Sequence, residues 1–401
     1  MLQPNIWEFQ FWWLLPLLLS VSGLFLSLWI VISAPTFFLL PLGVCAPELS
    51  PWLLMINAIA LVWAVSVKGW LSYFILVCSL IGLSLSLLPL LQLSATNQRF
   101  EQEMARALGQ DYVNNISQDL QSQMRPRSFA IADAFRGIPT QEVRIDRGIV
   151  FASPDGVDLK LNIYRPLQKG KYPALIVIYG GAWRSGSPDG YEQFSCYMAA
   201  RGYSVVTIDY RHAPEYKFPQ QLEDVKTALQ YIRDRAADLE IDLNKMAIMG
   251  RSAGGHLASL VAYQDVISWQ AVINYYGPTN LVEGYYDLPS PDPIDIQDVL
   301  ENFLGGTPEE QLPKYQQASP INYIKPNLPP SLLVYPGRDR LVQAKFGKEL
   351  YDKLIANNNT AILLEIPWAE HAFDAVFFGV SNQLILYYTE RFLAFTLNNE
   401  S

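Results

Sequence analysis

The residues around Ser252 have the types and spacing of an activated serine nucleophile. The apolar run Met246–Met249 predicts a buried strand, and it leads directly into Gly-Arg-Ser-Ala-Gly-Gly and a helix-compatible segment ending at Tyr263. A strand, a sharp turn with serine at its apex and a helix form a nucleophile elbow. Gly250 and Gly254 suit such a turn, because side chains there would collide across it. Since Gly-x-Ser-x-Gly also occurs by chance in glycine-rich loops, the prediction depends on partner residues elsewhere in the chain.

A serine hydroxyl needs a general base, and the sequence offers only three histidines. His256 falls one turn into the helix behind Ser252, which indicates a packing or capping role. His212 follows a predicted strand and precedes Ala-Pro-Glu, and we interpret it as structural. His371 comes directly after the last predicted strand, where parallel sheets carry their sites. We therefore predict that His371 is the base.

The third catalytic group must orient the imidazole and stabilise its charged form. Asp339 follows the predicted strand Leu332–Tyr335 at its carboxyl end, one strand before the strand of His371. Asp374 is too close to His371 in sequence to reach round to it. The other acidic candidates lie in a proline-rich insertion with no strand before them: Asp287, Asp292, Asp295 and Asp298. The predicted triad is therefore Ser252, Asp339 and His371.

A second glycine-rich turn could stabilise the negative charge that develops on a substrate oxygen. Tyr-Gly-Gly-Ala-Trp, residues 179–183, ends the predicted strand that begins at Ala174. Small residues at a strand end let backbone N–H groups point into a cavity, as an oxyanion hole requires. We predict donors at Gly180, Gly181 or Ala182, together with the N–H of Ala253 directly after the nucleophile.

The elements that must position these residues alternate between strand and helix. Apolar runs predict strands at 174–179, 203–208, 246–249, 271–275, 332–335 and 362–366, and helices are predicted at 191–201, 220–237, 253–263, 343–356 and 381–397. This alternation predicts an α/β fold with a mostly parallel, doubly wound sheet. The segments 148–152 and 159–164 around Pro154-Asp155-Gly156 predict an antiparallel hairpin at one edge.

The N-terminal region predicts an all-helical transmembrane segment. Hydrophobic residues make up 50% of the chain and are concentrated near its start. Up to Gln98 the only charged residues are Glu8, Glu48 and Lys68. We predict about three spans, at 11–33, 52–67 and 70–91, with residues 35–44 re-entrant or lengthening the first span. A cleaved signal peptide fits poorly, and a buried helical domain of a soluble protein is the alternative. Arg99 and Arg106 after the last span favour a multi-pass protein with a cytoplasmic catalytic domain.

The predicted organisation is a transmembrane region at 1–94, a linker or cap helices at 95–142 and a catalytic domain at 143–401. The helical part of the linker could lie over the catalytic mouth or serve only as a spacer. The net charge of −9 argues against nucleic acid as a partner. Three scattered cysteines, Cys45, Cys78 and Cys196, suggest neither a disulfide framework nor a metal site.

Residues 143–397 resemble the α/β-hydrolases, in particular the hormone-sensitive-lipase-like esterases of the acetyl- and feruloyl-esterase branch. The resemblance is carried by residues 179–183, 209–215 with Phe218-Pro219, 250–256 and 337–339. It implies hydrolysis of carboxylic esters without a cofactor. The family usually has His at the position of Tyr179, a third Gly at the position of Ala182 and often Gly after the catalytic histidine, where this chain has Ala372. These differences concern substrate preference and rate more than the class of reaction.

We therefore predict a membrane-anchored serine hydrolase that cleaves small-molecule or lipid-like esters. The alternatives are a serine peptidase or amidase, and a catalytically silent membrane receptor with a hydrolase fold. A transporter would require polar residues inside the spans, of which the sequence has almost none. The insertion at 281–324 either packs over the site or is a surface excursion.

Overall fold

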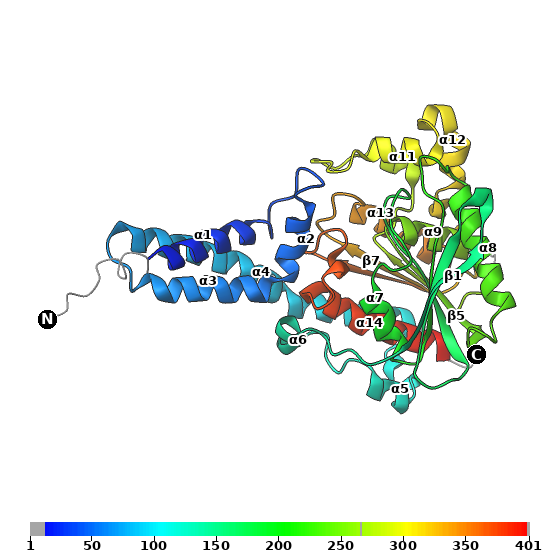
Figure 1. Cartoon of the computed structure of the whole chain (residues 1–401), viewed down its shortest axis with the longest axis horizontal. Coiled ribbons are helices and arrows are strands. Elements are labelled where there is room, and N and C mark those ends of the chain that lie inside the picture. Colours follow the sequence, from blue (N-terminus) through cyan, green and yellow to red (C-terminus); the bar gives the residue numbers. More distant parts are fainter. Residues whose placement is uncertain (1–12, 265–266, 399–401) are drawn as a thin grey trace.

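The computed structural model describes residues 13–264 and 267–398. Figure 1 shows a helical bundle at the N-terminal end, which extends from an α/β domain built on one sheet. The sheet has eight strands in the order β1-β2-β4-β3-β5-β6-β7-β8. Their bounds are β1 Arg144–Ala152, β2 Leu159–Arg165, β3 Tyr172–Ile178, β4 Ser204–Ile208, β5 Ile241–Arg251, β6 Ala271–Tyr275, β7 Ser331–Pro336 and β8 Ala361–Ile366.

The sheet is mostly parallel, as the sequence predicts. All neighbouring pairs from β4 to β8 run parallel, whereas β1 pairs with β2, and β2 with β4, in antiparallel fashion. The predicted hairpin therefore lies at one edge. The central strands are mostly apolar and are buried along nearly their whole length, because both faces of the sheet are covered. The carboxyl ends of β5, β7 and β8 consequently lie at the same rim.

Helices cover both faces of the sheet. α7 (Glu192–Ala199) and α14 (Val380–Asn398) lie on one face, and α8 (Gln220–Asp234) and α9 (Ala253–Tyr263) pack together on the other (Figure 1). α13 (Ala344–Ala356) connects β7 to β8 and packs against both. The insertion between β6 and β7 contains three further helices: α10 Leu281–Tyr286, α11 Ile296–Leu304 and α12 Pro308–Gln317.

The N-terminal bundle contains α1 (Leu14–Leu28), α3 (Ser50–Ala64) and α4 (Trp70–Leu108), joined by the short α2 (Leu40–Glu48). Among the described residues, only α4 is by itself long and apolar enough to cross a membrane; α2 and α3 qualify as a pair, but they meet at an angle of 79°. The segment at 35–44 therefore does not lengthen the first span, because α2 starts a separate helix. The predicted first span begins at residues 11–12, which lie outside the described residues.

The bundle exposes large apolar side chains and buries several polar ones. Asn57 is fully buried where α1, α3 and α4 meet, and its Nδ2 donates to Ser27 Oγ at 3.1 Å and to Ser86 Oγ at 3.5 Å. A side chain at Gly23 or Gly82 would overlap the Asn57 amide, so both neighbouring helices need glycine at this level. Small residues around a polar centre are typical of helix contacts in membranes.

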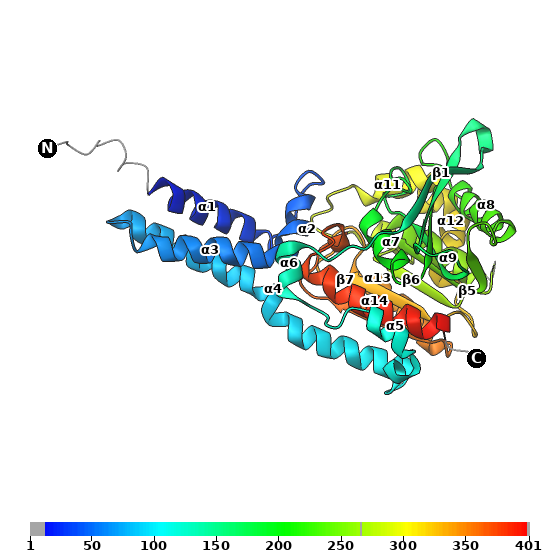
Figure 2. The same ribbon diagram turned by 60° about the horizontal axis from the view of Figure 1, so that its bottom comes forward.

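α4 continues without a break beyond the apolar region into the polar sequence that was predicted to be a linker. Its last turns pack against β8 and α14, and Arg99 donates to the carbonyl of Glu365 at the end of β8 (Figure 2). The short helices α5 (Gln118–Gln123) and α6 (Ile131–Arg136) follow. The helical part of residues 95–142 does not line the cavity above Ser252. The end of α4 packs against β8 and α14 instead.

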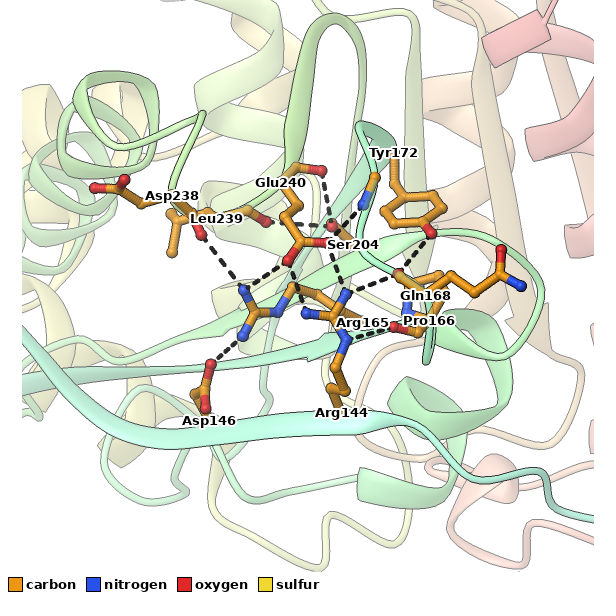
Figure 3. Close-up of polar contacts among 11 residues, drawn as sticks. Arg144, Asp146, Arg165, Pro166, Gln168, Tyr172, Ser204, Asp238, Leu239 and Glu240 are labelled. Atoms are coloured by element: carbon orange, nitrogen blue, oxygen red, sulfur yellow. Dashed lines mark hydrogen bonds and ion pairs between the residues drawn. The ribbon is translucent and has the colours of Figure 1, made fainter.

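An ion-pair network holds the antiparallel edge of the sheet to the start of β5 (Figure 3). Arg144 of β1 donates to both carboxylate oxygens of Glu240, at 2.7 and 2.6 Å, and Arg165 of β2 lies 3.4 Å from the same carboxylate. Arg165 also pairs with Asp146. The hydrogen bonds from Arg144 lower the pKa of Glu240 to about 2.

Candidate active site

Ser252 lies at the apex of a tight turn between β5 and α9. Its backbone has φ 51° and ψ −123°, a conformation that a non-glycine residue adopts only under strain. A Cβ at Gly250 would overlap the carbonyl oxygen of Gly254, and a Cβ at Gly254 would overlap the carbonyl oxygen of Ile178. Gly250 is therefore required by the close approach of backbone across the turn, and Gly254 by the close approach of the end of β3.

The structure brings the three residues of the predicted triad together. His371 Nε2 lies 3.0 Å from Ser252 Oγ, and His371 Nδ1 lies 2.7 Å from Asp339 Oδ2. Because the Asp339 carboxylate accepts a hydrogen bond from Nδ1–H, the proton stays on Nδ1 and Nε2 is free to accept the proton of the serine hydroxyl. The chain order is serine, aspartate, histidine, as in the α/β-hydrolases.

Asp339 is held rigidly by the loop that follows β7. Its Oδ1 accepts hydrogen bonds from the backbone N–H groups of Leu341 and Val342, both at 2.8 Å, which leaves Oδ2 for His371. A second carboxylate lies nearby: Glu370 Oε1 accepts from the N–H of His371 at 3.0 Å. Burial, and then the Asp339 carboxylate, raises the pKa of Glu370 to about 7.

The other two histidines have structural partners. His256 is fully buried, accepts a hydrogen bond from Trp183 Nε1 at 3.2 Å and donates to the carbonyl of Ala318 at 2.6 Å. Burial lowers its pKa to about 4, so it remains neutral. His212 Nε2 contacts the hydroxyl of Tyr179 at 2.9 Å. Neither imidazole ring contacts Ser252, although the backbone N–H of His256 donates to the carbonyl oxygen of Ser252 at 3.0 Å within the first turn of α9.

The predicted oxyanion turn lies beside the serine. A Cβ at Gly180 would be 2.7 Å from the carbonyl oxygen of Arg251, so the loop approaches the elbow closely. Among the described residues, the N–H groups of Gly181, Ala182 and Ala253 donate no hydrogen bond to protein atoms. Ala182 has φ 52°, a left-handed conformation that explains why glycine is favoured at this position.

A buried ion pair supports the elbow, and the sequence analysis did not identify it. Arg251 pairs with Asp374, which also accepts a hydrogen bond from Tyr276. The guanidinium lies 4.2 Å from the centre of the Tyr191 ring. Asp374, considered as a rival for the triad, therefore has a different partner. The only signal for it was an arginine inside an otherwise apolar strand end.

A cavity of about 340 Å³ opens above Ser252. Its walls contain Ser252, His371, the oxyanion turn and apolar side chains from the β6–β7 insertion. The insertion therefore packs over the site. Two residues of the N-terminal region, Phe37 and Leu40, also line this cavity. Within residues 13–264 and 267–398, no group of three His, Cys, Asp or Glu side chains could hold a metal ion.

Comparison with known proteins agrees with this geometry. Residues 161–354 match the family model BD-FAE. The chain is 32% identical over 219 residues to the esterase LipC of Mycobacterium tuberculosis, covering 50% of this chain and 53% of LipC. It is 38% identical over 146 residues to the arylacetamide deacetylase of Bos taurus, covering 34% of this chain and 36% of that protein.

Solved structures of esterases also resemble this chain. A fungal esterase from Rhizomucor miehei superposes with a TM-score of 0.52 at 25% identity, over 60% of this chain and 79% of that one. This chain spans only about half of the length of the curated relatives LipC, LipM and LipQ that it matches. The eight-stranded domain of this chain has the α/β-hydrolase fold, and the relatives that it resembles include proteins named as esterases.

Proposed function

We propose that this protein is a membrane-anchored serine hydrolase that cleaves carboxylic esters. The observation that carries the proposal is the continuous hydrogen-bonded chain from Ser252 through His371 to Asp339, which opens into a largely apolar cavity. The matched relatives named as esterases support the same class of reaction.

In the proposed reaction, Ser252 Oγ attacks the ester carbonyl carbon while His371 Nε2 takes the hydroxyl proton. The carbonyl oxygen becomes an oxyanion, and the carbon–oxygen bond to the alcohol then breaks as His371 returns the proton to the leaving alcohol. A water molecule attacks the acyl-enzyme by the same route and releases the carboxylic acid and the free serine. Asp339 keeps the imidazole oriented and stabilises its charged form.

The oxyanion is proposed to bind the unpaired amides next to the serine. Gly181 and Ala182 supply N–H groups from the β3 turn, and Ala253 supplies one from the first turn of α9, where helical N–H groups have no partner within the helix. Gly180 allows the turn to approach the elbow. One such donor contributes about 3 kcal/mol to stabilisation of the transition state.

We further propose that the N-terminal helices are embedded in a bilayer. The supporting observation is their inverted polarity: serines and Asn57 are buried inside, while large apolar side chains face outward, including Leu18, Val62 and Tyr73, at 63%, 72% and 73% exposure. In water such a surface would be costly. The division at 1–94, 95–142 and 143–401, the multi-pass topology and the cytoplasmic position of the catalytic domain are parts of this proposal.

The test is hydrolysis of p-nitrophenyl butyrate by the full chain in detergent, with Ser252→Ala as the decisive variant. The exposed Ser153, in the β1–β2 hairpin, gives the control Ser153→Ala. The parent and the control should hydrolyse the ester and react with a fluorophosphonate probe at Ser252, whereas Ser252→Ala should do neither. Equal hydrolysis by parent and Ser252→Ala would refute the mechanism, and a parent without activity or labelling would favour a silent receptor.

An amide substrate is the second candidate reaction. One matched relative is named for deacetylation of an arylacetamide, and the same triad can cleave either bond. Measuring an acetanilide beside the butyrate ester under the same conditions decides between them. The proposal requires the ester to be the better substrate by kcat/KM.

A further inference from the structure

The cavity above Ser252 extends to the proposed membrane region. Phe37 and Leu40 lie in and after the loop between α1 and α2, yet they line the same cavity as Ser252 and His371. From this continuity we infer that the loop at 32–39 forms an entrance from the bilayer, through which the apolar chain of a membrane-resident ester reaches Ser252. This inference rests on the proposed function and specifies its class of substrate.

The entrance is apolar on the side of the N-terminal helices. Phe37 lines the cavity but remains 66% exposed, and Phe38 beside it is 87% exposed. Val31 and Ile32, at 48% and 46% exposure, continue the surface towards the exposed Phe25 of α1. The sequence contains no charged residue between positions 9 and 47. On the side of the loop at 32–39, a hydrocarbon chain therefore meets only uncharged side chains, whereas the charged residues that line the cavity, Arg184, Arg251 and Asp287, belong to the α/β domain and its insertion.

The opposite side of the entrance belongs to the β6–β7 insertion. Ile294, Ile296, Val299 and Leu300 of this insertion line the cavity. Figures 1 and 2 both show the chain before α11 extending to the loop between α1 and α2. Two segments more than 240 positions apart in the sequence thus enclose one opening, at the level where the bundle meets the α/β domain.

The inner wall at Leu40 is firmly packed. Leu40 is 7% exposed and belongs to an apolar cluster with Trp29, Val44 and Leu53, against which Leu341 of the Asp339 loop also packs. The cavity thus has a reacting end at Ser252 and a separate apolar end at Phe37 and Leu40. A short, water-soluble ester can fill only the reacting end, whereas a long chain bound at Ser252 extends towards the loop.

The experiment compares two substrates on the full chain reconstituted in phosphatidylcholine vesicles. p-Nitrophenyl acetate is supplied in solution and p-nitrophenyl palmitate within the vesicles, and the measured quantity is the ratio of their kcat/KM values. Phe37→Ser removes apolar surface from the entrance, and Leu40→Trp fills the inner end. Each should lower the palmitate-to-acetate ratio by about tenfold, as expected for the loss of contact with about two methylene groups.

The matched control is Phe74→Ser. Phe74 lies on α4, is 43% exposed and does not line the cavity, so the variant loses a lipid-facing aromatic ring without altering the entrance. Its ratio should equal that of the parent. An equal fall in Phe74→Ser, or an unchanged ratio in both Phe37→Ser and Leu40→Trp with Ser252 still labelled by a fluorophosphonate, would overturn the inference alone. Failure of the parent to hydrolyse even p-nitrophenyl acetate would instead overturn the proposed function as well.

Discussion

At the scale of single residues, the position of one proton on His371 decides whether Ser252 can act as a nucleophile. Asp339 accepts two backbone N–H groups on Oδ1 and the imidazole on Oδ2. Each oxygen therefore has a fixed role. If Asn replaced Asp339, its amide oxygen would have to accept the two backbone N–H groups. Its NH₂ group would then face His371.

Asp339→Asn should lower kcat for ester hydrolysis by about 10³- to 10⁴-fold with little change in folding. The amide oxygen would take the two backbone N–H groups, and the NH₂ group would then donate to Nδ1. The imidazole proton would move to Nε2, which could no longer accept the serine proton. Steady-state kinetics with circular dichroism as a control would check this, and a loss below tenfold would contradict the assigned role of Asp339.

The proximity of Ser252, Asp339 and His371 could be predicted from the sequence because each residue follows a recognisable strand. Parallel strands bring their carboxyl ends to one rim, so elimination among three histidines was sufficient to select the one that lies beside Ser252. The Arg251–Asp374 pair was missed because a buried ion pair between distant positions leaves no periodic pattern. Phe37 and Leu40 were missed because their contact with the cavity depends on how the bundle packs onto the α/β domain.

At the scale of elements, the elbow between β5 and α9 depends on the absence of side chains. Gly254→Ala should strongly destabilise the protein, by roughly 3 kcal/mol or more, because its methyl group would overlap backbone that cannot move away. Gly284→Ala in α10 is the matched control, since no atom lies within 4 Å of its added methyl group. Thermal unfolding of both variants in detergent measures the difference, and equal melting temperatures would show that the turn can relax.

The ion-pair network at the sheet edge gives the stability a dependence on pH. The pKa of Glu240 lies below its ordinary value of 4.5, at about 2. Its contribution is therefore complete above pH 4.5 and is lost as the pH falls towards 2. Glu240→Gln should cost about 1–2 kcal/mol at pH 7 and almost nothing near pH 2, after allowance for screening at this partly exposed site.

Chemical unfolding of parent and Glu240→Gln across this pH range measures the difference. Glu192→Gln breaks the exposed pair between Arg147 and Glu192 and serves as the control, for which no resolvable change is expected. A difference that stays constant between pH 7 and pH 2 would indicate that the carboxylate charge is not responsible.

The end of α4 was not predicted correctly, because the helix continues past the point where the sequence changes from apolar to polar. The change from apolar to polar residues at position 95 suggested the end of a span and the start of a linker. The helix nevertheless continues to Leu108, because this polar stretch consists largely of helix-favouring residues and Gly109 is the first residue to end it. A change in solvent environment therefore need not coincide with the end of an element.

At the scale of the whole molecule, the bundle and the α/β domain share contacts at the active site. Arg338, next to Asp339, donates to the carbonyl of Ile30 at the end of α1. On the other side of Asp339, Arg340 Nε lies 3.3 Å from Ser33 Oγ. The N-terminal region therefore contacts the loop that carries Asp339, the proposed catalytic carboxylate.

Deletion of residues 1–95 should consequently reduce stability as well as remove the proposed membrane anchor. We expect the melting temperature to fall by about 5–10 °C relative to the full chain in the same detergent, since buried hydrogen bonds and an apolar cluster are lost. Differential scanning fluorimetry measures this change. A truncated domain with an unchanged melting temperature would show that the two parts fold and act independently.

The unbroken course of α4 has a kinetic consequence. A helix of 39 residues is about 58 Å long, and its two ends are packed into the bundle and against β8. With the N-terminal helices anchored in a bilayer as proposed, these contacts would hold the rim that carries Ser252 at a constant height above the lipids. With the entrance fixed in the plane of the lipids, encounters would occur by lateral diffusion in two dimensions. The rate of ester hydrolysis would then depend on the mole fraction of ester among the lipids. Adding inert lipid at a constant total concentration of ester would lower this rate.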